Sequence, residues 1–252
     1  MSRDALMAMA AAREIRDGDV AFIGTGLPMV AAYLAKATHA PEVTLVFESG
    51  IIDPAPLELA TGVGEYRLAY GATSIRGTRA ALTLLQQGKV DIGFLGTAEI
   101  DAYGNLNTTA IGDYHRPDVR LPGSGGANDI ASMARRSVII ARTGRRRFVE
   151  TLHYLTTPGH LTGPGARREV GLPGDGPVRV ITDMGVLGFS PETQRMRAER
   201  LFPGVTLEAL QDGIGFALDP PDEVTMLAPP DDATLERLRW IDPAGTYVAL
   251  ED

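Results

Sequence analysis

Residues 20–47, VAFIGTGLPMVAAYLAKATHAPEVTLVF, carry the pattern that sets the architecture of this chain. The two ends of the stretch, VAFIG and VTLVF, are short apolar runs of the kind that form buried strands. The turn GTGLP at 24–28 leads into a helix predicted over 28–38, and Pro28 suits its first turn. Strand, helix and strand in this order predict two parallel strands joined by a helical crossover.

The same alternation continues on both sides of this stretch. Further helices are predicted at 3–17, 77–88 and 127–135, and further strands at 91–96 and 137–142. The fold class is therefore α/β, with an open, largely parallel sheet and helical crossovers. The turn GTGLP lacks the complete glycine pattern of a nucleotide-binding loop, so no nucleotide site is assigned to it.

The composition of the chain changes beyond residue 145, where Gly and Pro are frequent in TTPGHLTGPG and GLPGDGPV. A strand is predicted in VRVITD, a hairpin in GVLGFSPETQRMRAE, and two late helices in TLEALQDGI and DATLERLRWI. We expect this part to be an irregular C-terminal layer of a single domain that spans residues 1–252.

Bulk composition excludes several classes of function. The net charge of −8 disfavours general nucleic-acid binding, which needs a basic field, and the run Arg142 with Arg145 to Arg147 is interpreted as a solvated turn. The absence of cysteine removes disulfides, cysteine-ligated zinc and thiol nucleophiles. No window approaches the roughly 18 apolar residues of a membrane span, and the start lacks the apolar run of a signal peptide. We therefore expect a cytoplasmic protein without a membrane span.

Glu48 is the first candidate functional residue, because functional groups in open α/β sheets gather at the carboxyl ends of the strands. It directly follows the apolar run VTLVF, and Ser49 and Gly50 then allow the chain to turn sharply. This position would expose the carboxylate to a cleft. The alternative is a structural carboxylate that caps a helix or pairs with an arginine, and the tripeptide alone does not separate the two.

The segment GSGGAND, residues 123–129, is the second candidate. Three glycines in four residues precede a predicted helix, which presents backbone amides to an anion or a developing oxyanion. The alternative is a tight loop whose glycines only permit positive φ angles. The candidate residues of this glycine loop are Gly123, Ser124, Gly125, Gly126, Ala127 and Asn128.

The segment IDAYGNLNTTAIGDYH, residues 100–115, is rich in turn-forming residues. Tyr103, Gly104 and Asn105 predict a hairpin turn between two strands. None of the four histidines falls in an H-x-x-x-H pair or beside a G-x-S-x-G serine, so no metal site and no serine hydrolase is predicted. The polar residues that remain as pocket candidates, together with Ser49 and Gly50, are Asn105, Asn107, Asp113 and His115.

Six ordered segments resemble the β subunit of CoA-transferases of the glutaconate type, nearly from end to end. They are GTGLPMVAAYLAK, VFESGIIDPAPLE, IDAYGNLNTTAIGDYHRP, GSGGAND, RRRFVETLHYLTTPG and GLPGDGPVRVITDMGVLGF. Each segment is short, but their shared order and spacing make the match specific. The resemblance implies the family I CoA-transferase fold, a heteromer with an α subunit, and a catalytic glutamate at the ESG motif, which is Glu48 here.

The resemblance also implies a mechanism with a CoA thioester as substrate and no permanently bound cofactor. The glutamate attacks an acyl-CoA, releases CoA thiolate as an acyl-glutamyl anhydride forms, and is then converted to a glutamyl-CoA thioester. A carboxylate suits this exchange because the anhydride retains the transfer potential of the thioester. The glutamate is ionised at neutral pH and needs no neighbouring base, but the anhydride needs a site that excludes water. An oxyanion role is implied for the amides of Gly125 and Gly126.

Several alternatives remain open. A related decarboxylase carries cysteine at the glutamate position, and a related ring hydrolase lacks the ESG motif, so the retained Glu48 favours transfer. A non-catalytic partner with a structural Glu48 is the third alternative. Glutaconate or a similar short dicarboxylic or 3-oxo acid is the expected substrate, and a heterotetramer or larger assembly is the expected form.

Overall fold

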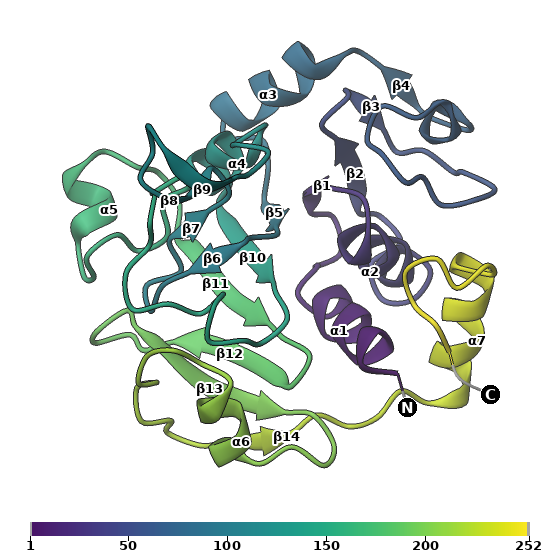
Figure 1. The fold of residues 1–252 in the computed structure, drawn as a ribbon. Helices are drawn as coiled ribbons and strands as arrows, with labels where there is room; N and C mark the ends of the chain where they lie inside the picture. Colours follow the sequence, from purple (N-terminus) through teal and green to yellow (C-terminus); the bar gives the residue numbers. More distant parts are fainter. Residues whose placement is uncertain (1, 251–252) are drawn as a thin grey trace. The chain divides into compact units, whose positions relative to one another are not determined.

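The computed structural model describes residues 2–250, which form two compact units (Figure 1). The first unit holds the described residues up to Phe94 together with those from Pro229 onward, and the second unit holds Leu95–Ala228. The single domain over 1–252 stays a prediction.

The strands of the first unit follow the order β5-β1-β2-β3-β4. They are β1 (Val20–Ile23), β2 (Thr44–Phe47), β3 (Ile51–Ile52), β4 (Ser74–Ile75) and β5 (Ile92–Leu95). Strand β1 pairs in parallel with both β2 and β5, whereas β3 pairs antiparallel with β2 and β4. The helix α2 (Leu27–Lys36) connects β1 to β2, so the strand, helix and strand predicted over residues 20–47 are confirmed.

Helices and one short 3-10 turn complete the first unit. They are α1 (Arg3–Ala12), α2, η1 (Tyr66–Ala69), α3 (Thr78–Gln86) and α7 (Asp232–Ile241). Helix α1 packs against α2, and its residues from Ala5 to Ala12 are all buried. Small alanine side chains on both helices allow the two backbones to approach closely.

Helix α1 is shorter than the helix predicted at 3–17. It ends at Ala12, and residues 16–19 form a tight turn in which the Asp19 carboxylate accepts a hydrogen bond from the Arg16 amide at 2.8 Å. Gly18, with φ of 79°, provides the left-handed conformation that this turn requires. The amphipathic pattern continues past the helix because Ile15 is still buried outside it.

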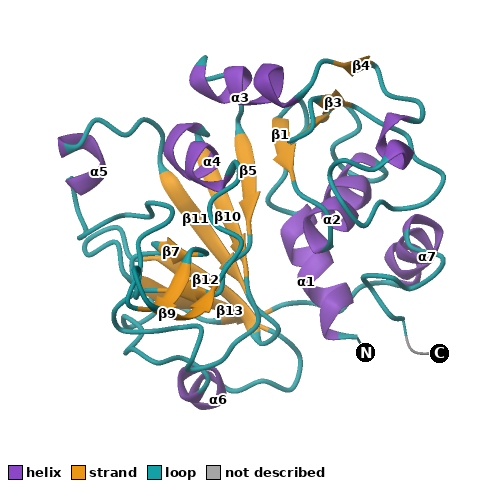
Figure 2. Ribbon diagram, turned by 45° about the horizontal axis from the view of Figure 1, so that its top comes forward, coloured by secondary structure: helices purple, strands orange, loops and turns teal. Residues whose placement is uncertain are grey.

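The strands of the second unit follow the order β14-β13-β12-β11-β10. They are β10 (Arg136–Ile140), β11 (Gly176–Ile181), β12 (Gly185–Phe189), β13 (Met196–Leu201) and β14 (Thr225–Met226). Strands β10 and β11 are parallel and β11, β12 and β13 are antiparallel, as the orange arrows of Figure 2 show. The α/β class is confirmed, with parallel pairs and antiparallel pairs mixed, and the hairpin predicted after residue 185 is β12 and β13.

Two small antiparallel hairpins and three helices complete the second unit. The hairpins are β6 (Glu99–Ile100) with β7 (Leu106–Asn107), and β8 (Ala110–Gly112) with β9 (Pro117–Arg120). The helices are α4 (Ala127–Met133), α5 (Ala166–Glu169) and α6 (Leu207–Asp212). The predicted hairpin turn at Tyr103–Asn105 is confirmed between β6 and β7. Within residues 2–250, no helix is long and apolar enough to span a membrane.

Candidate functional site

Glu48 lies at the carboxyl end of β2, which is the position that the sequence predicts. Residues Leu45 to Phe47 of this strand are buried, and Glu48 itself is partly exposed. The parallel register places Phe47 opposite Ile23, so the loop after β1 and the turn after β2 lie at the same edge of the first unit. The carboxylate of Glu48 therefore lies where the strand leaves the core and reaches the surface.

A tight turn fixes the direction of Glu48. The Gly50 amide donates a hydrogen bond to the Phe47 carbonyl at 2.8 Å, with Glu48 and Ser49 between them. Gly50 has φ of 82°, and a Cβ atom at this position would overlap the backbone of Gly77. Only glycine satisfies both conditions, so the sharp turn expected at Ser49–Gly50 is confirmed.

Ser49 presents a buried hydroxyl beside Glu48. Its Oγ atom has no hydrogen-bond partner among the residues that the structure describes. A buried polar atom without a partner typically costs about 1–3 kcal/mol, so this hydroxyl has the capacity to bond with a molecule bound next to Glu48.

The loop after β1 brings a helix terminus to the same edge of the first unit. Gly26, with φ of 87°, is the N-cap of α2, and no side chain caps this terminus. Gly24 has open space where a side chain would project. The amino terminus of a helix favours negative charge, so this loop suits an anionic group bound near Glu48.

The glycine loop of the second unit precedes α4, as the sequence predicts. Gly123 and Gly125 adopt positive φ angles of 93° and 48°, and Gly126 is the N-cap of the helix. The Ser124 hydroxyl accepts a hydrogen bond from the Asn128 amide at 3.1 Å, and the Ser124 carbonyl accepts one from the Ala127 amide at 2.9 Å. These contacts hold the turn that leads into the helix.

Neighbouring segments of the second unit hold the glycine loop in place. The Thr108 hydroxyl donates to the Gly123 carbonyl, and the Gly123 amide donates to the Thr108 carbonyl, both at 2.8 Å. The Asn128 side-chain amide donates to the Thr156 carbonyl at 2.9 Å. Loop positions at both ends of the turn are thus bonded to residues far away in the sequence.

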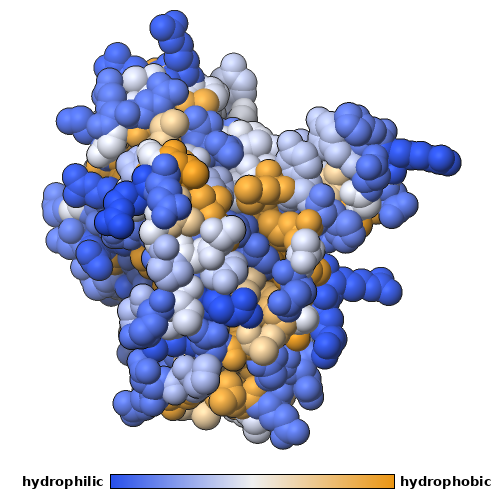
Figure 3. Space-filling model, turned by 90° about the vertical axis from the view of Figure 1, so that its left-hand side faces the viewer, coloured by the Kyte–Doolittle hydropathy of each residue, from blue (hydrophilic) through white to orange (hydrophobic). Residues whose placement is uncertain are grey.

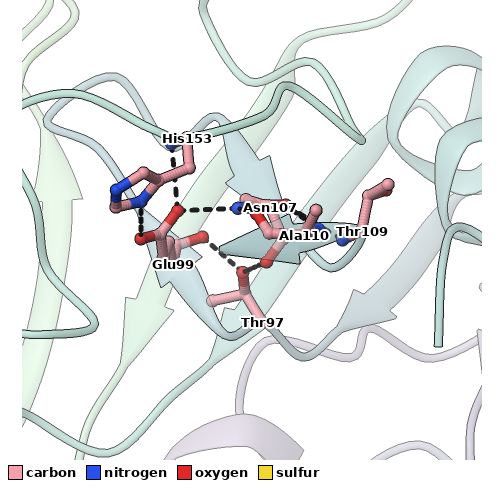
Figure 4. A network of polar contacts seen from close by, with 6 residues as sticks. All are labelled: Thr97, Glu99, Asn107, Thr109, Ala110 and His153. Carbon is pink, nitrogen blue, oxygen red and sulfur yellow. Dashed lines mark hydrogen bonds and ion pairs between the residues drawn. The ribbon is translucent and has the colours of Figure 1, made fainter. Parts of the chain in front are cut away.

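Asn107 belongs to a buried network, drawn in Figure 4, that the sequence did not reveal. Its side-chain amide donates to the Glu99 carboxylate and to the Ala110 carbonyl, both at 2.7 Å. Glu99 in turn contacts the imidazole of His153, with Oε1 and Nδ1 2.6 Å apart. Glu99 and His153 are separated by 54 residues, so no local motif could have paired them.

Asn105 is also buried and fully bonded. Its side-chain nitrogen donates to Asp101 and to the Leu161 carbonyl, each at 2.8 Å. Its side-chain oxygen accepts from the amides of Gly159 and Leu161 at 2.7 and 3.1 Å. Asn105 therefore links the β6–β7 turn to the loop at 159–161, and its role as a pocket residue stays a prediction.

Asp113 and His115 lie at the exposed turn of the β8–β9 hairpin. The Asp113 carboxylate accepts hydrogen bonds from the amides of His115 and Arg116 at 2.8 and 3.0 Å, which stabilises the turn. The basic run at 142–147 also forms a turn, in which Arg147 donates to the Arg142 carbonyl at 2.8 Å. Across residues 2–250, no cluster of three or more His, Asp or Glu side chains could hold a metal ion.

Known proteins are similar in sequence to this chain over nearly its whole length. A family model described as coenzyme A transferase matches residues 5–213. The chain is 41% identical to the B subunit of 3-oxoadipate CoA-transferase from Pseudomonas knackmussii, over 96% of this chain and 93% of that protein. It is 38% identical to the B subunit of glutaconate CoA-transferase from Acidaminococcus fermentans, over 97% of this chain and 94% of that protein.

Solved structures show the same likeness. The crystal structure of glutaconate coenzyme A-transferase from Acidaminococcus fermentans matches with a TM-score of 0.94 and 36% identity, covering 100% of this chain and 98% of that one. The crystal structure of the decarboxylase AibA/AibB matches with a TM-score of 0.85 and 27% identity, covering 98% and 97%.

Proposed function

This chain belongs to the coenzyme A transferase family, and we propose that it is the subunit that supplies the nucleophile, Glu48, for transfer of CoA between two carboxylic acids. The observation that carries the proposal is the position of Glu48 at the end of the buried strand β2, in a turn where only glycine fits at residue 50.

The proposed reaction begins when the Glu48 carboxylate attacks the thioester carbonyl of the donor acyl-CoA. The carbon–sulfur bond breaks, CoA thiolate leaves, and an acyl-glutamyl anhydride forms. The thiolate then attacks the glutamyl carbonyl, which releases the donor acid and leaves Glu48 as a CoA thioester. The acceptor carboxylate attacks this thioester, which releases CoA thiolate and forms an anhydride between the acceptor acid and Glu48. The thiolate then attacks the acceptor acyl carbonyl of this anhydride, which forms the new acyl-CoA and releases the Glu48 carboxylate.

Donors for the developing oxyanions are proposed in the glycine loop. The resemblance assigns this role to the amides of Gly125 and Gly126, and the positive φ angles of Gly123 and Gly125 support a loop that turns its backbone toward a ligand. The remaining residues of the loop, Ser124, Ala127 and Asn128, hold its shape through the hydrogen bonds described above. Ser49, with its buried hydroxyl, is a further donor beside Glu48.

A partner subunit is part of this proposal, in a heterotetramer or larger assembly. The two relatives described above are themselves named as B subunits. On the face in Figure 3, apolar residues form separate patches among hydrophilic ones, as they do on most protein surfaces. A partner that covers Glu48 would also exclude the water that hydrolyses an anhydride. We place the assembly in the cytoplasm.

The proposed substrate is glutaconate, 3-oxoadipate or a similar short dicarboxylic or 3-oxo acid, because the relatives carry these names. The likeness to the decarboxylase AibA/AibB supports a second candidate, which is decarboxylation on the same fold. The chain lacks cysteine and retains Glu48, which favours transfer.

The test uses this chain co-purified with its partner subunit. The complex is incubated with glutaconyl-CoA or 3-oxoadipyl-CoA, treated with borohydride, and digested for mass spectrometry. We expect reduction of Glu48 to the alcohol, and loss of both the adduct and transfer in Glu48→Gln. A matched control is Glu42→Gln, which replaces an exposed glutamate of the same unit. Full transfer by Glu48→Gln would refute the assignment of the nucleophile, and a decarboxylated product without transfer would favour the second candidate.

A further inference from the structure

We infer that the buried Glu99 and the half-exposed His153 form a positioning pair that fixes the conformation of the glycine loop at residues 123–128. The inference rests on the proposed function, because the loop is the proposed source of oxyanion donors. All the contacts that carry it lie within the second unit, and its central part is drawn in Figure 4.

Glu99 is almost completely buried, with 2% of its surface exposed. Its Oε1 atom lies 2.6 Å from His153 Nδ1, and its Oε2 atom accepts from the Asn107 side chain at 2.7 Å and from the His153 amide at 3.1 Å. A buried carboxylate is retained only where such partners compensate for lost hydration. The two carboxylate oxygens of Glu99 therefore bond to two segments of the chain, one at residue 107 and one at residue 153.

The first segment reaches the glycine loop through Asn107. A carboxylate only accepts hydrogen bonds, so Glu99 fixes the orientation of the Asn107 amide with its nitrogen toward Glu99. The Asn107 oxygen then faces the amides of Thr109 and Ala110, at 2.9 and 3.3 Å. This turn holds Thr108, whose carbonyl and hydroxyl make both hydrogen bonds to Gly123.

The second segment reaches the loop through Thr156. His153 anchors the start of this segment on Glu99. Three residues later the Thr156 hydroxyl accepts from the Thr108 amide at 2.9 Å, and the Thr156 carbonyl accepts from Asn128 at 2.9 Å. The two segments thus contact opposite ends of the glycine loop, and Glu99 is bonded to both of them.

The variants that test this inference remove or conserve the pairing. Glu99→Ala removes both anchors. Glu99→Gln conserves them, because the glutamine oxygen accepts from Asn107 and the His153 amide while its nitrogen donates to a neutral His153 ring. His153→Ala removes only the ring contact with Glu99, at a half-exposed side chain, and keeps the hydrogen bond from the backbone amide of residue 153, so it serves if Glu99→Ala fails to fold. Glu150→Ala replaces an exposed glutamate of the same unit as the control.

Steady-state kinetics and hydrogen exchange of the complex with its partner provide the readouts. We expect Glu99→Ala to lower kcat by about tenfold to a hundredfold with little change in KM, because oxyanion donors act in the transition state. His153→Ala should show a smaller loss, and Glu99→Gln should rescue most of the activity. Amide exchange across residues 123–128 should rise in parallel with the loss of kcat.

Two results would overturn the inference. One is wild-type kcat in Glu99→Ala, and the other is a loss of kcat without faster exchange in the glycine loop. Failure of the proposed function gives a different pattern. Full transfer by Glu48→Gln would refute the assignment of Glu48 as the nucleophile, whereas the exchange data on the Glu99 variants would still report on the glycine loop. A complex in which Glu48→Gln is inactive and Glu99→Ala is fully active refutes the positioning pair alone.

Discussion

Gly50 and Gly77 are in such close contact that a side chain on Gly50 would overlap the Gly77 backbone. The Gly50 carbonyl also accepts a hydrogen bond from the Arg76 amide at 2.8 Å. The turn that presents Glu48 is thereby fastened to the segment that begins α3. A change at Gly50 should disturb stability and the direction of Glu48 together.

We predict that Gly50→Ala lowers the free energy of unfolding by more than about 2 kcal/mol and reduces transfer activity. A positive φ costs a non-glycine residue about 1 kcal/mol, and the overlap with Gly77 adds to it. Gly88→Ala is the control, because Gly88 has φ of 65° but open space around its Cβ position. Chemical denaturation of both variants measures the difference, and equal losses would contradict the close contact.

Ser49→Ala should lower activity without lowering stability. The Ser49 hydroxyl has no hydrogen-bond partner among residues 2–250, so its removal breaks no hydrogen bond within the described chain. If it bonds with the substrate or the anhydride, kcat/KM should fall by about tenfold. Thr157→Val is the matched control, since Thr157 carries a buried hydroxyl of the same kind. Unchanged kinetics for Ser49→Ala would exclude the contact with substrate.

His160 should make the stability of the second unit depend on pH. Burial lowers the pKa of His160 to about 4, and its Nε2 atom lies 3.0 Å from the Pro177 carbonyl, which can only accept a hydrogen bond. Between about pH 6.5 and pH 4 the unfolded chain therefore binds a proton that the folded chain does not. This residue stabilises the fold fully above pH 6.5, and its contribution falls by roughly 3 kcal/mol as the pH approaches 4.

The variant His160→Gln tests this dependence. The glutamine amide can still donate to the Pro177 carbonyl but does not titrate. Urea unfolding of both proteins from pH 7 to pH 4 should show that the wild type loses about 3 kcal/mol more of its free energy of unfolding than the variant does. The other titrating groups are the same in both proteins, so their effects cancel in this comparison. A difference that stays constant over this range would contradict the lowered pKa.

Asn105→Ala should destabilise the chain and leave KM unchanged. The substitution leaves the amides of Gly159 and Leu161 without their acceptor, at a cost of about 1–3 kcal/mol for each buried amide. Asn107 offers a comparison of the same residue type, since Asn107→Ala should in addition lower kcat through the glycine loop. A large change in KM for Asn105→Ala would instead support its predicted place in the substrate pocket.

Much of the fold followed from local pattern. The apolar runs at 20–24 and 43–47 and the turn at 24–28 were enough to predict β1, α2 and β2, because a buried parallel strand needs a nearly continuous apolar sequence. The two-residue strands β3, β4 and β14 were missed as elements, since two residues are too few to show any period. Helix α1 was predicted too long because the buried Ile15 continued its pattern into a turn.

The candidate site, too, could be predicted from the sequence only in part. The place of Glu48 at a strand end and the glycine turn beside it are properties of adjacent residues, so the amino-acid sequence alone was sufficient to predict them. The close approach of Gly50 to Gly77, the pairing of Glu99 with His153 and the three hydrogen bonds of Asn105 to Gly159 and Leu161 join residues from distant segments. Such contacts exist only after the chain has folded, because most buried polar groups then find a partner in whichever segment lies beside them.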